Sequence, residues 1–237
     1  MSKTFLWIED RKDKSGYSFW KTFMEQLFPY VTVESKKNNS ELVKAVKALN
    51  DKVNRYIVVF DNSFDNLQVL LELKILAEAV KEKDNVAFLD IVCFEYLLLE
   101  FKGLIDWVFA PDDEFLDKRA EIIKVRSKLV GAISKGISSY KEIQEIKDYC
   151  DNIEGYNIEQ LSAKILFELT RNTGFEVSKG SIGDCWIKSC CDWSKRQDDD
   201  ICGLDHSRLD IHEKMKHILL GTCLQNEFRE LGLEEGS

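Results

Sequence analysis

The run Tyr56-Ile57-Val58-Val59-Phe60-Asp61 decides the fold class of this chain. An unbroken apolar run rich in β-branched residues is typical of a strand buried on both faces of a parallel sheet. Lys3 to Ile8 on one side and Val86 to Leu89 on the other have the same β-rich character, and segments of helical period separate all three. Strand and helix therefore alternate, which predicts an α/β domain with a mainly parallel sheet.

This α/β domain is expected to span residues 1–111. Its other expected elements are a helix over Tyr17 to Phe28, a strand at Val31 to Val33, a helix capped by Ser40, helices at Asn66 to Lys81 and Phe94 to Phe101, and a strand at Ile105 to Phe109.

After Pro111 the strand signal ends, and residues 112–237 are expected to form a helical accessory region that packs on the first. A Cys- and His-rich segment, 180–206, has no clear period. The expected helices are Asp117 to Ile133, Lys141 to Tyr149, one opened by a capping box of Asn157 and Gln160, and Ser207 to Leu220.

Composition limits the possible functions. The chain has 237 residues and a formal net charge of -9, which excludes a protein whose whole surface binds nucleic acid but leaves room for a local basic strip. No histidine precedes His206, so chemistry in the α/β domain must rest on other side chains. The apolar runs are too short for a membrane helix and the N-terminus does not resemble a signal peptide, which predicts a cytoplasmic protein without membrane contact.

Carboxylates follow the ends of the predicted strands. Glu9 and Asp10 follow the first strand, Asp61 ends the third, Asp65 lies in the loop after it, and Glu95 lies in the helix after the fourth strand. Because parallel strands present their carboxyl ends at one edge of a sheet, these side chains are expected to gather there and to hold a divalent cation such as Mg²⁺. The alternative is that they are helix caps and solvated turn residues.

Two motifs resemble a known family. The run Leu6-Trp7-Ile8-Glu9 and the later run Val58 to Asp65 look like a Toprim domain of the variety found in OLD-like nucleases and related phage-defence proteins. The resemblance implies a nuclease that cleaves phosphodiester bonds in DNA or RNA with Mg²⁺ or Mn²⁺. It implies Glu9 as general acid/base and Asp61 as a metal ligand.

The motifs also depart from that family. Asp10 stands where the family often has Gly, and Ser63 stands where its second metal-binding Asp is expected. Asp65 could substitute for the missing ligand, and Glu95 resembles a later acidic position of the OLD-like branch. The departures leave open a second function class, a non-catalytic binding or assembly module with a degenerate site and a protein partner.

A receiver domain uses the same acidic residues. In that alternative Asp61 would accept a phosphoryl group, with Glu9 and Asp10 completing the acidic pocket. The fourth strand lacks the Ser or Thr that such a domain requires, and the fifth lacks its Lys. The receiver alternative therefore ranks below the Toprim alternative.

The cysteine-rich segment suggests a second metal site. Cys185-x4-Cys190-x11-Cys202-x3-His206 supplies four ligands of the kind that tetrahedral Zn²⁺ takes. The alternatives are buried thiols, which are common in protein cores, and a reactive Cys202 paired with His206.

Overall fold

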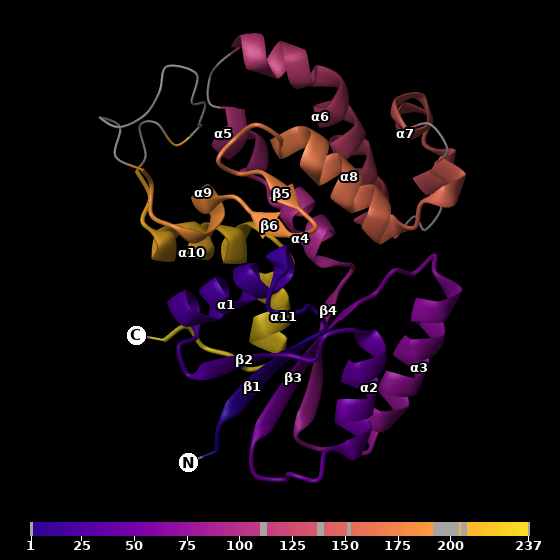
Figure 1. The fold of residues 1–237 in the computed structure, drawn as a ribbon, viewed down its shortest axis with the longest axis vertical. Helices are drawn as coiled ribbons and strands as arrows, with labels where there is room; N and C mark the ends of the chain where they lie inside the picture. The colour runs from indigo at the N-terminus through magenta and orange to yellow at the C-terminus, as the bar shows by residue number, and fades with distance from the viewer. Residues whose placement is uncertain are drawn as a thin grey trace.

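The computed structural model describes residues 2–109, 113–136, 140–150, 153–191, 204 and 208–236, with the side chains of 109 and 113–115 left aside. Four strands form one parallel sheet in the order β2-β1-β3-β4, which confirms the α/β class (Figure 1). The strands are β1 (Thr4–Ile8), β2 (Val31–Ser35), β3 (Arg55–Asp61) and β4 (Val86–Ile91).

One face of the sheet is covered by two helices, α2 (Asn39–Ala48) and α3 (Leu67–Lys81) (Figure 1). Alternate residues of β3 point to this face, so Tyr56, Val58 and Phe60 pack in a small core beneath the two helices. The other residues of the same strand point away from it, and Asp61 continues that second set.

The opposite face carries the main core. Helix α1 (Ser15–Leu27) buries an aromatic face there, at the helical spacing that the sequence predicts. Phe19 contacts Phe94 with ring centroids 5.2 Å apart and the rings tilted, and Phe23 contacts Phe228 near the C-terminus with centroids 5.8 Å apart. The same continuous core extends through the later helices, so the accessory region and the α/β domain are packed together.

Most of the accessory region lies above the carboxyl edge of the sheet in Figure 1, whereas α11 lies beside α1 on the face that carries the main core. Its elements and those that lead to it are α4 (Phe94–Glu100), α5 (Leu104–Phe109), α6 (Asp113–Ile133), η1 (Tyr140–Glu142), α7 (Gln144–Tyr149), η2 (Ile153–Gly155), α8 (Ile158–Thr170), β5 (Val177–Ser178), β6 (Ser181–Ile182), α9 (Asp184–Ile187), α10 (Ile211–Gly221) and α11 (Leu224–Glu230).

Several predicted elements were wrong in type or in their limits. Residues 105–109 belong to α5, not to a fifth strand, because Leu104, Trp107 and Val108 are buried at helical spacing against the main core. Helix α2 is capped by Asn38, not by Ser40, since the Asn38 side chain accepts a hydrogen bond from Glu41 N–H.

The end of the chain also differs from prediction. Helix α10 begins at Ile211, four residues later than predicted, where Asp210 and Glu213 form a capping box. Helix α11 and the β5–β6 hairpin were not predicted. The capping box of Asn157 and Gln160 at α8 is confirmed.

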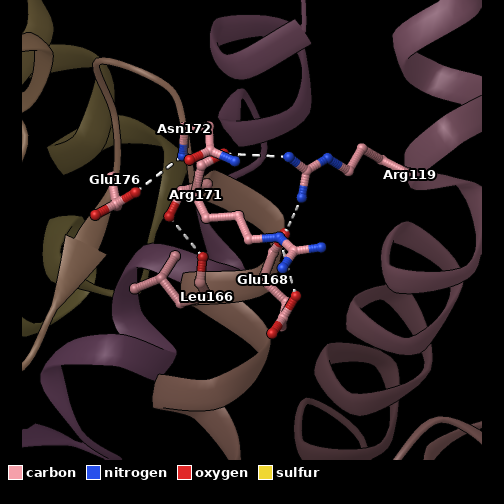
Figure 2. A network of polar contacts seen from close by, with 7 residues as sticks. Arg119, Leu166, Glu168, Arg171, Asn172 and Glu176 are labelled. Carbon is pink, nitrogen blue, oxygen red and sulfur yellow. Dashed lines mark hydrogen bonds and ion pairs between the residues drawn. The ribbon is translucent and has the colours of Figure 1, made fainter.

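The C-terminus of α8 is held by an arginine from α6. Arg119 donates hydrogen bonds to the carbonyl oxygens of Glu168 and Arg171, and Arg171 is in turn paired with the Glu168 carboxylate at 3.2 Å (Figure 2). A cation at a helix C-terminus satisfies carbonyls that have no partner within the helix. This contact fixes α8, which faces the carboxyl edge of the sheet, against α6.

No helix among the described residues is both long and apolar enough to cross a bilayer.

The shared core predicts a single unfolding event for both regions. Trp186 is fully buried, contacts Trp107 and Phe175, and donates its indole N–H to Phe175 O. Trp186→Ala should lower the free energy of unfolding by about 3–5 kcal/mol. Urea unfolding followed by circular dichroism and by tryptophan fluorescence should show one shared, shifted midpoint.

The control is Leu71→Ala, because Leu71 is 56% exposed on α3 and should change stability by less than about 0.5 kcal/mol. Two separate transitions in the wild-type protein would contradict a common core.

Candidate functional site

A cavity of about 600 Å³ opens at the carboxyl edge of the sheet. It lies where β1 and β3 end and where α1, α2, α4 and α8 present their first residues, the place where open α/β sheets bind ligands. It is lined by Glu9, Asp10, Arg11, Lys14, Ser15, Lys37, Asn38, Asp61, Phe94, Glu95, Glu159 and Lys179.

Glu9 and Asp61 meet in this cavity. Their carboxyl groups are hydrogen-bonded to each other, which requires a proton on one of them. Burial raises the pKa of Glu9 from 4.5 to about 8, and burial together with the charge of Glu9 raises the pKa of Asp61 well above 3.8. The pair therefore holds at least one proton at neutral pH.

Further carboxyl groups crowd the same cavity. Burial raises the pKa of Glu95, in the first turn of α4, to about 7, and it raises the pKa of Asp10 to about 6. Glu159, in the first turn of α8, contributes a repulsive charge to each of these two groups. The accessory region thus adds an acidic group to a site built mainly by the sheet.

Asp65 lies outside the cavity lining. Its carboxylate accepts the Tyr140 hydroxyl and the Ile158 backbone N–H, the latter at 3.1 Å. The same Tyr140 hydroxyl also lies 2.7 Å from Tyr156 O, so its one proton is shared between the two acceptors. The structure therefore places Asp65 at a link between the loop after β3 and the start of α8, and it gathers Glu9, Asp61 and Glu95 without it.

Basic side chains line the same cavity. Arg11 and Lys14 come from the loop after β1, Lys37 from the loop before α2 and Lys179 from the hairpin turn of the accessory region. Lys37 has a φ of 76°, so its backbone is in the left-handed region. Acidic and basic groups that face one cavity suit a ligand with both a metal-binding part and an anionic part.

The donor chemistry of the site fits a hard divalent cation, because carboxylate oxygens are its preferred ligands and a cation would offset the charge of the crowded carboxyl groups. The present side-chain arrangement joins two carboxyls, Glu9 and Asp61. Over the parts of the chain that the structure describes, no group of three or more His, Cys, Asp or Glu side chains is arranged to hold a metal ion.

Only two of the four predicted zinc ligands, Cys185 and Cys190, belong to the described residues. Cys202 and His206 lie outside the described residues. Cys185 and Cys190 are partly buried, and Cys185 Sγ packs so closely on Gly174 that a Cβ there would lie 2.4 Å from the sulfur. The proposed zinc site therefore stays a prediction.

A buried lysine organises this segment. Lys214 is fully buried, and its Nζ donates to Cys185 O at 2.9 Å and to Lys188 O at 2.8 Å. These carbonyls belong to and follow α9, so the ammonium group satisfies the end of that helix. The sequence did not reveal this role, because Lys214 lies in a charged helix that resembles a solvated one.

Several cavity residues were not predicted from the sequence. Glu159 and Lys179 lie more than 90 residues beyond Asp61 in the chain, and no local pattern marks them. Lys14 and Ser15 follow Glu9 closely and stand at the start of α1. That position is the sequence signal that could have placed them at the carboxyl edge of the sheet.

Comparison of the chain with protein-family models, with curated proteins and with solved structures finds no match.

The raised pKa values predict how stability depends on pH. In metal-free protein, Glu9 keeps its proton in the folded state but loses it in the unfolded state between pH 4.5 and about pH 8. For Glu95 the same difference holds between pH 4.5 and about pH 7. The free energy of unfolding should therefore fall as pH rises from about 5 to about 8.

Glu9→Gln should flatten this dependence and raise stability at pH 8 by on the order of 2 kcal/mol relative to wild type. Urea unfolding with a chelator at several pH values measures it. Glu25→Gln is the control, because Glu25 is exposed on α1 and pairs with Lys21 outside the site. Equal pH slopes for wild type and Glu9→Gln would show that the carboxyl is not buried in this way.

Proposed function

We propose that the protein is a metal-dependent hydrolase that cleaves phosphodiester bonds in nucleic acid. The observation that carries the proposal is the hydrogen-bonded pair of Glu9 and Asp61 in the cavity at the carboxyl edge of the sheet, with raised pKa values. The Toprim resemblance of the two motifs points to the same pair.

Glu9 has the properties of a general acid/base. Burial brings its pKa to about 8, near the pH at which an enzyme works, so the carboxyl group can both hold and release a proton. It would take a proton from the attacking water or give one to the leaving oxygen. Its hydrogen bond to Asp61 orients it for either step.

Asp61 and Glu95 are the residues that would hold the metal ion. Each lines the cavity, and each is held at its position by secondary structure, Asp61 at the end of β3 and Glu95 in the first turn of α4. When bound, Mg²⁺ or Mn²⁺ supplies Lewis acidity at the phosphate and lowers the pKa of bound water. Asp65, at its link to Tyr140 and Ile158, takes no part in this proposal.

The basic side chains would position the substrate. Arg11, Lys37 and Lys179 are exposed, and they line the cavity that holds the carboxyl groups. This local positive charge is what a chain with a net charge of -9 needs to bind a phosphate backbone. A role in phage defence is the extension of the proposal that the resemblance implies.

A non-catalytic binding module is the second candidate. Ser63, where the Toprim pattern has its second Asp, is fully buried and its hydroxyl has no hydrogen-bond partner among the described residues. A metal ligand is therefore absent at that position, which favours a fold that kept its acidic edge and lost the reaction. The receiver alternative has less support, because α5 stands where its fifth strand would be.

Cleavage assays test the catalytic proposal. Purified protein with Mg²⁺ or Mn²⁺ should cut plasmid DNA or tRNA, and Glu9→Gln and Asp61→Asn should each lower the rate by about 100-fold or more, because the first removes the proton-transfer group and the second a metal ligand. Glu25→Gln should cleave at the wild-type rate.

Cleavage that survives in a pure preparation of Glu9→Gln would remove the catalytic assignment. Absence of cleavage in wild type, with folding intact, would favour the binding module.

Metal binding can be measured without activity. Mn²⁺ titration followed by electron paramagnetic resonance should show one site, and Glu95→Gln should weaken it by about tenfold or more. Glu25→Gln should bind as wild type does. Equal Mn²⁺ affinity in wild type and Glu95→Gln would place the metal elsewhere.

A further inference from the structure

The N-terminus of α1 has free hydrogen-bond donors. Within the described chain, the backbone N–H groups of Ser15, Gly16 and Tyr17 have no partner, and the first turn closes only with Ser18 N–H on Lys14 O at 3.2 Å. The N-cap residue, Lys14, has a side chain that cannot accept these donors. The turn also contains no acidic residue, so positive partial charge remains at this end of the helix.

The other long helices with a described start differ. An Asn or Asp side chain accepts hydrogen bonds from the first turn of α2, α3, α8 and α10. The starts of α2 and α8 also face the cavity, but an Asn side chain caps each of them, whereas the start of α1 is uncapped.

Ser15 provides an independent observation. The residue is only 4% exposed, it lines the cavity, and within the described part of the chain its hydroxyl makes no hydrogen bond. Most polar side chains buried to this degree have a partner. The hydroxyl therefore lies in the cavity wall as an unused donor beside the unused backbone donors of the same turn.

Cations complete the surroundings of this turn. Lys14 is largely buried, with 22% of its side chain exposed, and Lys37 and Lys179 line the cavity with it. The Lys14 ammonium lies 4.0 Å from the Asp13 carboxylate, at the limit of an ion pair, and so keeps donors for another anion. Ammonium groups, a hydroxyl and helix N–H groups together are the donors that bind phosphate groups in proteins.

Asp10 is an acidic group of the cavity that lies against this turn and opposes an anion there. Its Oδ2 packs against Gly16, where a Cβ would lie only 2.1 Å away, so a glycine is required at 16. Burial raises the pKa of Asp10 to about 6, with the charge of Glu159 adding to the rise and Lys14 lowering it. No hydrogen bond joins this carboxylate to the turn among the described residues, so the donors of the turn remain available.

We propose that the N-terminal turn of α1, with the Ser15 hydroxyl and Lys14, binds the phosphate group of a phosphate ester, and that it does so without a metal ion. The site is separate from the Glu9 and Asp61 pair, although both open into one cavity. The inference goes beyond the proposed reaction, because the turn would bind phosphate even in a protein that cleaves nothing.

The test uses the full chain in a chelator-containing buffer, with inorganic phosphate as the first probe. Titration should shift the amide NMR signals of Ser15, Gly16 and Tyr17 in wild type. Ser15→Ala and Lys14→Gln should each weaken binding by about tenfold, the usual effect of removing a hydrogen bond to a charged group. Asp10→Asn should strengthen it, because that change removes the opposing charge.

Ser40→Ala is the matched control. Ser40 is also in the first turn of a helix, but its hydroxyl donates to Glu72 at 2.7 Å outside the cavity, so phosphate affinity should not change. Because the assay contains no metal, its result is separate from that of the cleavage assay. Absence of shifts at the α1 amides, or equal affinity in wild type and Ser15→Ala, overturns the proposal.

Competition distinguishes the two sources of a phosphate ester. Displacement of inorganic phosphate by a thymidine mononucleotide supports a terminal phosphate as the ligand. Displacement by a thymidine oligonucleotide without terminal phosphates supports the backbone of a nucleic acid. Failure of both to displace it overturns the proposal, because the turn would then bind no phosphate ester.

Discussion

The site depends on the burial of two carboxyl groups that the sheet brings together. Glu9 and Asp61 follow adjacent parallel strands whose register is fixed, with Ile8 opposite Val59, and both strands are buried on each face. The carboxyl groups have little freedom to separate, so a proton or a cation must lie between them. Burial raises the pKa of both groups, and the charge of Glu9 adds to the rise at Asp61, so the protonation of the pair depends on pH.

The accessory region completes this site as well as covering it. Glu159 and Lys179 line the cavity, and the link from Asp65 to Tyr140 and Ile158 ties the loop after β3 to the first turn of α8. Arg119 holds the other end of the same helix. The position of an acidic group in the cavity therefore depends on contacts made well outside the sheet.

The part of the fold that follows from local pattern was predictable, and the part that follows from packing was not. The run from Tyr56 to Asp61 identified the parallel sheet, and with it the meeting of Glu9 and Asp61, because strand ends share one edge. The short apolar run at 105–109 fits strand and helix equally well, and only its burial against the main core selects helix. The place of Asp65 was unpredictable for a similar reason, since its partner Tyr140 is 75 residues away.

The core that joins both regions has a consequence for how the chain can change. Phe23 of α1 and Phe28 just after it contact Phe228 of α11, and the Tyr30 hydroxyl beside β2 donates a hydrogen bond to Glu234 O near the C-terminus. Exchange of either half with that of another protein, by recombination or by engineering, would expose aromatic surface on both sides of the junction. We expect the two regions to be inherited together, and the side chains that face each other across the junction to co-vary.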